Sequence, residues 1–497
     1  MSDVFEKLTE NVLRAEVPLP RGALGSFLDG FGAEVVVGHP TFRNADNIGA
    51  EVGRGVAAAA KVYASRRVAF AVSDGTYRLD DPDGSTLAAA ARGAAEALAA
   101  LGEGARRSIA VTLLAYDGYG GDRTAGKGSA LKLLFDEMEA CSSLKKLVLL
   151  DGDLRNDLEP WFRVFLRVEE EHRKRARGRE FFVTARYARH FVDASLTRFV
   201  VGPLTTLMGQ YVPGGISGDI VLSAGAAARE RAAAWDEHRR RYGTDIATTF
   251  DNIADENTDV YEVYLGAKLH DITDEAKLSV MPGEVIGAAL GRILHYEKLD
   301  GRVTRLLAED GPCKRPVVWG PEKTGIDFID PGYTGVFDVD AKRSTLLTKF
   351  SAHADAMEKV LPPEAFARVR EARDRLRGLP AGDGDDLRFL GLTRELWVEI
   401  LYRSVAYLLR EQDPETAKSC LNYLYTAAFL ELCREKMLSL GAQTYGEARK
   451  LQKRLGVPPH RAKEFYEGEV DGVVERMALD FFRGRRRILD LLGAAGR

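Results

Sequence analysis

The 497-residue sequence has few cysteines, no excess of charge of one sign and no long apolar run. Its four cysteines, Cys141, Cys313, Cys420 and Cys433, are scattered and do not form the closely spaced pairs of a structural metal site. We therefore expect reduced thiols in a cytoplasmic protein. A net charge of −4 gives no broad attraction to nucleic acid. The lack of any apolar run of about 18 residues argues against a membrane span, and residues 1–16, which mix both charge signs, do not have the pattern of a signal peptide.

What the chain does have is a regular alternation of apolar runs and alanine-rich, helix-like segments. Strands are predicted at residues 34–40, 67–72, 108–115 and 147–150, and helices are predicted up to about residue 65, at 86–101 and at 129–140. Such an alternation is typical of an α/β protein with a parallel, nucleotide-binding sheet.

The pattern changes in the second half of the chain. Further strands are predicted at 181–184 and 260–264, with a helix near 190–210, and the sequence is mainly helical beyond about residue 300. We therefore predict three parts: an N-terminal helix (1–33), an α/β domain (34–300) and a helical C-terminal region (301–497).

The C-terminal region contains recognisable helix signals. Asp413 and Pro414 predict a helix start, and Gly441 predicts the end of that helix. Residues 379–386 are rich in Gly and Asp and predict a linker. The amphipathic segments Trp397–Arg410 and Ala417–Leu438 make a homo-oligomer an expectation.

The strand predicted at 147–150 ends at two carboxylates one residue apart, Asp151 and Asp153. In open α/β sheets, ligands bind outside the carboxyl ends of the strands. Carboxylate oxygens there can hold a hard divalent cation, Mg²⁺ or Mn²⁺, that bridges phosphate oxygens. His270 follows the strand at 260–264 and could join the two acids. The alternatives are a solvated turn at the acids and an ordinary core or surface histidine.

A glycine-rich loop follows the third predicted strand. Gly121 and Gly126-Lys127 nearly match the phosphate-binding P-loop, but Gly128 stands where that motif needs Ser or Thr. Lys127 remains a candidate cation beside a diphosphate, and a purely structural loop is the alternative. Asp245 precedes a helix-like run, so it is either an N-cap or a carboxylate that binds sugar hydroxyls.

A third set of polar residues has helical spacing. Arg189, Asp193 and Thr197 are four residues apart, so they would share one face of a helix. They form either a surface ion pair with a bystander threonine or a small pocket in which the arginine pairs with the carboxylate of an acceptor.

Taken in chain order, these motifs resemble the retaining GT-A glycosyltransferases of the mannosylglycerate synthase and glucosyl-3-phosphoglycerate synthase type. The resemblance covers roughly residues 34–300. It implies a GT-A (nucleotide-diphospho-sugar transferase) fold and the transfer of mannose or glucose to D-glycerate or a similar 2-hydroxy acid. The donor would be GDP-mannose, GDP-glucose or UDP-glucose, and the product a compatible solute.

The resemblance also implies roles for individual residues. The metal ligands would be Asp151, Asp153 and His270; the nucleotide contacts Pro40, Thr41, Asp46, Asp74, Lys127 and Asp151; the catalytic residues Lys127, Asp245 and Asp151; and the acceptor contacts Arg189, Asp193, Thr197, Gly215 and Ile216.

The chain also departs from the relatives. The phosphoglycerate enzymes carry a Gly-Gly-Gly-Arg segment for the acceptor phosphate, and the aligned position here, near Ser195, lacks that Arg, which favours glycerate over 3-phosphoglycerate. Asp271 stands where mannosylglycerate synthase has Arg. Transfer to 3-phosphoglycerate, a nucleotidyltransferase or P-loop NTPase, and a non-catalytic scaffold remain as alternatives.

Overall fold

The computed structural model describes most of the chain, in which two compact units are distinguished. The described residues are 4–16, 20, 22–75, 84–115, 126–176, 178–188, 194–270, 275–319, 339–378, 392–439, 441–444, 447, 450 and 469–494. The first unit comprises Met1–Tyr187, Ile216–Asp271 and Pro316–Gly325, and the second comprises Ala188–Gly215, Ile272–Arg315 and Ile326–Arg497. This division differs from the boundary predicted at residue 300, because two segments before that residue group with the C-terminal helices.

The first unit is built on one mixed sheet. In the described part of the chain its ten strands are β1 (Glu6–Lys7), β2 (Val12–Glu16), β3 (Val35–Thr41), β4 (Val68–Asp74), β5 (Ile109–Ala115), β6 (Lys146–Leu149), β7 (Glu180–Ala188), β8 (Ile220–Ser223), β9 (Thr258–Ala267) and β10 (Val317–Trp319). Their order across the sheet is β1-β2-β5-β4-β3-β6-β8-β7-β9-β10.

The direction of the strands decides which residues meet at each edge. Strands β2, β5, β4, β3 and β6 are parallel to their neighbours in this run, whereas β8 is antiparallel to both β6 and β7. Leu149 therefore lies opposite Ile220, and Ile220 lies opposite Thr184. The carboxyl ends of β3, β4, β6 and β7 thus share one edge of the sheet with the amino end of β8.

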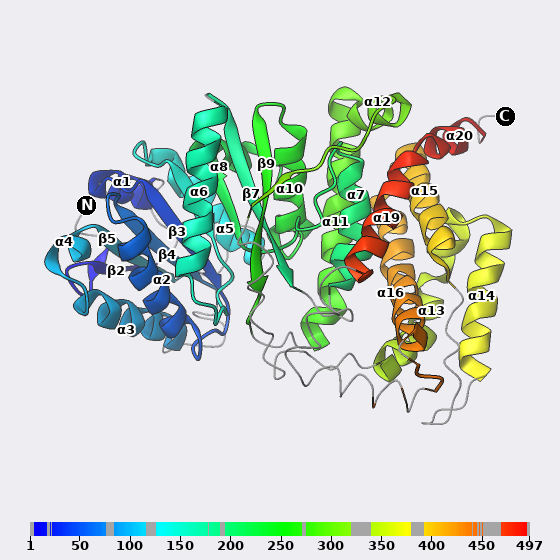
Figure 1. The fold of residues 1–497 in the computed structure, drawn as a ribbon, viewed down its shortest axis with the longest axis horizontal. Coiled ribbons are helices and arrows are strands. Elements are labelled where there is room, and N and C mark those ends of the chain that lie inside the picture. Colours follow the sequence, from blue (N-terminus) through cyan, green and yellow to red (C-terminus); the bar gives the residue numbers. More distant parts are fainter. Residues whose placement is uncertain are drawn as a thin grey trace. The chain divides into compact units, whose positions relative to one another are not determined.

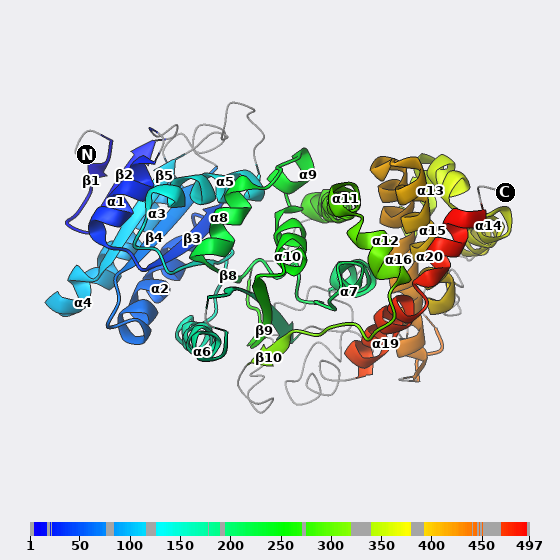
Figure 2. The ribbon, with the colours of Figure 1, turned by 90° about the horizontal axis from the view of Figure 1, so that it is seen from above.

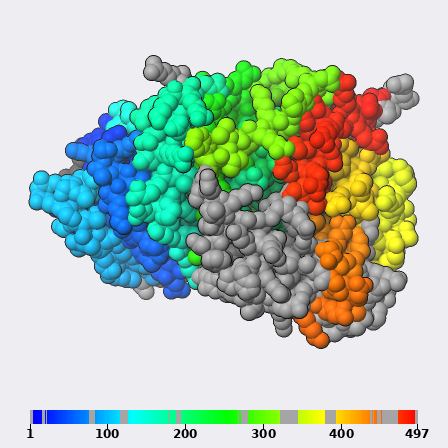
Figure 3. Space-filling view, viewed as in Figure 1, coloured from blue at the N-terminus to red at the C-terminus, as the bar shows by residue number. Residues whose placement is uncertain are grey.

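Helices cover both faces of this sheet. They are α1 (Ala23–Phe31), α2 (Ile48–Val62), α3 (Ser85–Ala99), α4 (Glu103–Arg107), α5 (Lys127–Glu137), the 3₁₀ turn η1 (Met138–Ala140), α6 (Glu159–Arg175), α8 (Ala224–Ala232), α9 (Glu237–Arg240) and α10 (Thr244–Ala254). Helices α2 and α6 lie on one side of the sheet, and α5 and α8 on the other (Figures 1 and 2). In the space-filling view, α2, α3 and α6 form much of the visible surface of the first unit (Figure 3).

The core under α2, α3 and α6 explains why the central strands are continuous apolar runs. Val37 of β3, Phe70 of β4 and Val148 of β6 are fully buried, and Val52 of α2 and Phe162 of α6 pack in the same cluster. Strands covered on both faces have no polar side to expose.

The second unit is helical. It contains the π-helical turn η2 (Thr197–Val201), α7 (Gly202–Thr206), α11 (Glu275–Asp300), α12 (Arg302–Ala308), α13 (Val339–Val360), α14 (Pro363–Gly378), α15 (Arg394–Glu411), α16 (Pro414–Ser439), α19 (Glu469–Arg483) and α20 (Arg486–Ala494). Trp397 on α15 is fully buried and donates through Nε1 to the Phe199 carbonyl at 3.0 Å. Among the described helices of the chain, none is both long and apolar enough to cross a membrane.

Most elements predicted from the sequence are present. The predicted fold class, α/β with a mainly helical C-terminal region, is confirmed. Helix α16 starts at Pro414, and the Asp413 carboxylate accepts from the Thr416 N–H at 3.0 Å, as an N-cap does. Gly441 ends the helix with a φ of 90°. The linker predicted at 379–386 lies outside the described residues.

Two predictions about the strands are wrong. The segment 1–33 is not simply a helix, because Val12–Glu16 forms β2, which pairs in parallel with β5, and only Ala23–Phe31 is helical. The sheet is not all parallel either, because β8, a strand that was not predicted, runs antiparallel to β6. Both strands are short and lack a long apolar run, so neither has a strong signal in the sequence.

Candidate functional site

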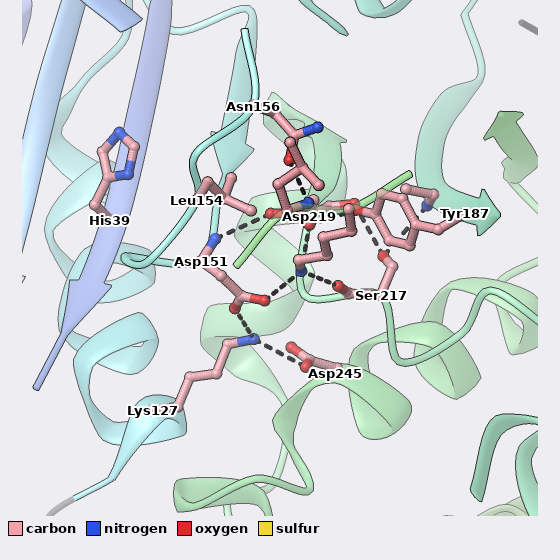
Figure 4. Close-up of polar contacts among 12 residues, drawn as sticks. His39, Lys127, Asp151, Leu154, Asn156, Tyr187, Ser217, Asp219 and Asp245 are labelled. Carbon is pink, nitrogen blue, oxygen red and sulfur yellow. Dashed lines mark hydrogen bonds and ion pairs between the residues drawn. The ribbon is translucent and has the colours of Figure 1, made fainter. Parts of the chain in front are cut away.

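Charged side chains from five separate segments meet at the carboxyl end of β6. Asp151 follows β6, Asp219 precedes β8, and Lys268 follows β9. Lys127 is the first residue of α5, and Asp245 lies in the first turn of α10. Figure 4 shows that Lys127 and Asp245 point toward Asp151. The strand directions described above bring these distant residues together.

The five charges form a continuous chain of ion pairs. Lys127 Nζ lies 2.7 Å from Asp151 Oδ1 and 2.9 Å from Asp245 Oδ2. Lys268 Nζ lies 2.5 Å from Asp151 Oδ2 and 2.6 Å from Asp219 Oδ2. Asp151 is thus held between two ammonium groups, one on each carboxylate oxygen, and 26 % of its side chain is exposed.

Further hydrogen bonds hold the inner residues of this ion-pair network, Asp219 and Lys268, in place. Asp219 Oδ1 accepts from the Asp151 N–H at 3.0 Å, and Tyr187 OH donates to Asp219 Oδ2. Lys268 also donates to the Ser217 carbonyl at 2.9 Å. Ser217 Oγ in turn accepts from the Ala185 N–H at 3.2 Å, which ties the segment to β7. The inner charges therefore have little freedom to move.

The ion pairs shift the pKa values of the outer groups. Burial alone would raise the pKa of Asp151, but the neighbouring Lys127 and Lys268 ammonium groups outweigh it and hold that pKa well below its usual range. Burial opposes a charge on Lys127 as well, yet Asp151 and Asp245 raise the pKa of Lys127. For Asp245, burial and the charge of Asp151 prevail over Lys127 and raise the pKa. Asp151 therefore stays ionised, and Asp245 is the carboxyl group of the cluster whose pKa is shifted toward protonation.

Two glycines make room for Asp151. Gly218 has a φ of +79°, and a Cβ there would lie 2.3 Å from Asp151 Oδ2. A Cβ on Gly152 would lie 2.7 Å from Thr41 Cγ2 and 2.9 Å from the Pro40 carbonyl oxygen. The glycine between the two acids thus lets their turn pack directly against the end of β3.

The glycines beside Lys127 have a packing role. A Cβ on Gly126 would lie 2.7 Å from the Arg240 carbonyl oxygen, and a Cβ on Gly128 would lie 1.9 Å from that of Arg239. The Gly128 N–H donates to the Arg241 carbonyl at 3.1 Å. The described part of the glycine-rich loop therefore places Lys127 by letting α5 approach residues 239–241. Gly121 lies outside the described residues.

Residues 239–241 are themselves held by a buried polar network. Arg239 Nη1 donates to Asp251 Oδ2 at 2.7 Å, and Arg239 also pairs with Glu230. Asn252 Nδ2 donates to Glu230 Oε1 at 3.0 Å. Because Arg239 stands in an Arg-rich stretch, the sequence alone gives no sign that it is buried.

The turn after β6 is clamped from two sides. Glu51 on α2 accepts from the Leu154 N–H at 2.8 Å, and Arg54 Nη2 donates to the Leu154 carbonyl at 2.6 Å. The Leu269 N–H donates to Asn156 Oδ1 at 2.8 Å, which connects the turn to the segment after β9. Glu51 also lies 2.9 Å from Nδ1 of the fully buried His39. Asp151 and Lys268 are thus carried by segments that are joined to each other.

The predicted nucleotide residues lie at the same edge of the sheet. Thr41 Oγ1 donates to Asp74 Oδ1 at 3.1 Å, so the ends of β3 and β4 are joined. Asp74 is fully buried, Pro40 is half-buried, and Asp46 is exposed in the loop after β3. The structure therefore brings Pro40, Thr41 and Asp74 to the carboxyl edge near the turn of Asp151, and Asp46 stays on the surface.

The predicted metal ligands are not gathered into a metal centre. Within the described ranges, no group of three or more His, Cys, Asp or Glu residues is arranged to hold a metal ion. Asp153 and His270 are both half-buried and follow β6 and β9, respectively. The geometry at Asp151 does not suit a divalent cation, because each of its oxygens already faces a lysine. The divalent cofactor stays a prediction.

The predicted acceptor residues are only partly described. Arg189 and Asp193 lie outside the described residues. Thr197 starts η2 in the second unit. Gly215 and Ile216 lie in the turn that leads to Ser217, where the Gly215 N–H donates to the Val212 carbonyl at 3.1 Å. The acceptor assignment stays a prediction.

Two site residues, Lys268 and Tyr187, were not predicted from the sequence. They lie at strand ends of the site and contact each other, and both also contact Asp219. Lys268 precedes the predicted ligand His270 by two residues, and Asp219 ends the segment that contains Gly215 and Ile216. A polar residue directly beside a predicted strand was the available signal, but a lysine there is ordinarily a solvated surface residue.

Comparisons with known proteins give distant structural likenesses. No family model matches the chain, and no curated protein matches it. The structure of glucosyl-3-phosphoglycerate synthase from Mycobacterium tuberculosis with Mn²⁺, UDP-glucose and glycerol 3-phosphate is 19% identical, covers 56% of this chain and 87% of its own, and has a TM-score of 0.35. Another structure of that enzyme is 18% identical, with coverages of 56% and 87% and a TM-score of 0.34. A further mycobacterial protein is 18% identical, with coverages of 54% and 78% and a TM-score of 0.34. At such values, the fold and the site of this chain are inferred from its own strands and side chains.

Proposed function

We propose that the chain is a retaining GT-A glycosyltransferase that moves mannose or glucose from a nucleoside diphosphate sugar to D-glycerate or a similar 2-hydroxy acid. The observation that carries this proposal is the placement of Lys127. Its ammonium group lies between Asp151 and Asp245, at the sheet edge where Thr41 and Asp74 also lie. In open α/β sheets this edge is where nucleotides bind.

Lys127 would stabilise the departing diphosphate. Among the described residues it donates to two carboxylates, which leaves one of its three N–H bonds for a phosphate oxygen. The pKa of Lys127 is raised, so the group stays a cation during the reaction. A fixed positive charge where negative charge develops is commonly the largest single contribution to catalysis.

Asp245 would position the donor sugar. Its Oδ2 accepts from Lys127 at 2.9 Å, and carboxyl oxygens held in this way can also accept hydrogen bonds from sugar hydroxyls. Each of the three carboxylates in the cluster, Asp151, Asp219 and Asp245, faces an ammonium group. Such pairing makes a carboxylate a poor nucleophile, which favours attack by the acceptor from the side of the departing diphosphate.

The acceptor is proposed from the sequence. D-Glycerate is favoured by the sequence, with 3-phosphoglycerate as the alternative. In either case the acceptor hydroxyl must reach the anomeric carbon beside the diphosphate, and positioning of that kind supplies much of the rate in group transfer.

A product assay tests the proposal. Purified full-length protein is incubated with D-glycerate or 3-phosphoglycerate and with GDP-mannose, GDP-glucose or UDP-glucose, each pair separately, with and without Mn²⁺. Products are identified by mass spectrometry. A glycosylated acid from one pair supports the proposal. Release of pyrophosphate or nucleotide hydrolysis without sugar transfer would indicate a nucleotidyltransferase or NTPase instead, and a chain that binds none of these donors would indicate a scaffold.

A further inference from the structure

Lys268 occupies a position that is lined by oxygen atoms. Its Nζ lies 2.5 Å from Asp151 Oδ2, 2.6 Å from Asp219 Oδ2 and 2.9 Å from the Ser217 carbonyl oxygen. The ammonium group also lies 5.2 Å from the centre of the Tyr187 ring. Only 5% of the Lys268 side chain is exposed.

This set of neighbours is the set that a hard divalent cation takes. Carboxylate and carbonyl oxygens at about 2.0–2.6 Å are the usual ligands of Mg²⁺ and Ca²⁺ in proteins. Here two carboxylates and one carbonyl already surround a covalently attached cation. A metal ion could reach the same oxygens only after the Lys268 ammonium had left.

We propose that Lys268 is a resident cation that replaces the divalent metal at Asp151, so that this chain binds nucleoside diphosphates without a metal ion. The inference rests on the proposed function and adds to it. Lys268 is a positioning residue, because its contacts hold Asp151 and Asp219 together. Lys127, on the opposite oxygen of Asp151, is the cation that meets the diphosphate.

Electrostatics explain why a cation is needed at this point. The cluster contains three carboxylates, Asp151, Asp219 and Asp245, which would repel a diphosphate anion if only Lys127 opposed them. Lys268 offsets one of the two negative charges of Asp151 and Asp219. The same task falls to the metal ion in sites where the acids are not paired with a lysine.

The first experiment titrates UDP and GDP into the full-length protein by calorimetry, in EDTA and in Mn²⁺. If Lys268 replaces the metal, the dissociation constants in the two buffers agree within about threefold, which is under 1 kcal/mol. Binding that is at least about tenfold weaker in EDTA would overturn the inference while leaving the proposed function intact. Failure of both nucleotides to bind in either buffer would overturn the proposed function, and this inference with it.

The second experiment changes the cation itself. In Lys268→Met, the carboxylates of Asp151 and Asp219 lose their shared counter-ion and become a site for Mn²⁺. UDP or GDP binding should then fall by at least about tenfold in EDTA and return when Mn²⁺ is added. A variant that binds equally well in EDTA would contradict the proposal.

A matched control separates this effect from damage to the fold. Lys61 is 64% exposed and pairs only with Glu159 among the described residues, so Lys61→Met should leave nucleotide binding unchanged in both buffers. Near-ultraviolet circular dichroism shows whether Lys268→Met is folded. If it is not, the titration of the wild-type protein decides by itself, because it needs no variant.

Discussion

Strand β6 has a carboxylate between two basic groups at each of its ends. At its amino end, Glu169 pairs with Lys146 and Arg66, both at 2.8 Å. At its carboxyl end, Asp151 pairs with Lys127 at 2.7 Å and Lys268 at 2.5 Å. The two clusters have the same charges and similar distances, but their surroundings differ.

The amino-end cluster is closed. Lys146 is fully buried and lies 4.4 Å from the centre of the Tyr63 ring. Burial lowers the pKa of Lys146 to about 8 even though Glu169 opposes the shift. All three charged groups, Glu169, Lys146 and Arg66, are paired within the protein, as in a structural ion-pair cluster.

The carboxyl-end cluster is open. Asp151 is 26% exposed, further carboxylates extend the chain of charges, and Gly152 packs it against the end of β3. The same arrangement of a carboxylate between two basic groups is thus a structural cluster where the carboxylate is mostly buried, at Glu169, and a candidate binding site where the carboxylate stays partly exposed, at Asp151. Four predictions test this difference, beginning with the largest expected effect.

The first prediction concerns the open cluster. Asp151→Asn removes the charge that holds the Lys127 and Lys268 ammonium groups in place, so sugar transfer should fall by about 10²–10³-fold, the usual cost of losing an aligned charge at a reaction centre. Each lysine keeps another carboxylate, Asp245 or Asp219, so the loss in the free energy of unfolding should be smaller than the loss predicted below for Glu169→Gln. Steady-state kinetics and urea unfolding measure the two effects. A fully active variant would contradict the assignment of the site.

The second prediction concerns the closed cluster. Glu169→Gln leaves Lys146 buried without its counter-ion, which should lower the free energy of unfolding by about 3 kcal/mol. The rate of transfer per folded molecule should stay the same, because Glu169 lies at the other end of β6. The two variants should therefore rank oppositely in the two assays: Asp151→Asn loses more activity, and Glu169→Gln loses more stability. If both variants lost activity equally, the distinction between the clusters would be wrong.

The third prediction uses the pH dependence of the turn after β6. Burial raises the pKa of Glu51 from 4.5 to about 7, against the effect of His39. A raised carboxyl pKa adds stability that is complete below pH 4.5 and is lost as the pH rises through about 7. Because Glu51→Gln does not titrate, the unfolding free energy of the wild type should fall by about 3 kcal/mol relative to that of the variant between pH 4.5 and 7.

Urea unfolding at several pH values measures this difference, and Glu103→Gln, whose side chain is 76% exposed, is the control. A difference that does not vary with pH would mean that Glu51 does not titrate in the folded protein.

The smallest expected effect is at Gly218. Gly218→Ala and Gly178→Ala both place alanine at a positive φ, +79° and +80°, but only at Gly218 does the new Cβ meet Asp151. Both variants should lose about 1 kcal/mol of stability from backbone strain. Only Gly218→Ala should also reduce transfer, by about tenfold, because Asp151 must move. Equal activities of the two variants would show that the position of Asp151 is not critical.

The sequence was sufficient for the parts of the molecule that depend on local pattern. The apolar runs of β3 to β6 and the acids after β6 follow directly from residue order, and the structure places Lys127, a predicted site residue, in ion pairs with Asp151 and Asp245. The pairing of Lys268 with Asp219 could not be predicted, because it depends on the antiparallel direction of β8. The burial of Arg239 depends on tertiary packing in the same way.

The most direct test of the central claim is a crystal structure of the full-length protein with UDP-glucose or GDP-mannose. The account predicts the diphosphate within hydrogen-bonding distance of Lys127 Nζ, at about 3 Å, with the nucleoside beside Asp74. A nucleotide bound elsewhere on the chain, or a diphosphate that does not contact Lys127, would contradict it.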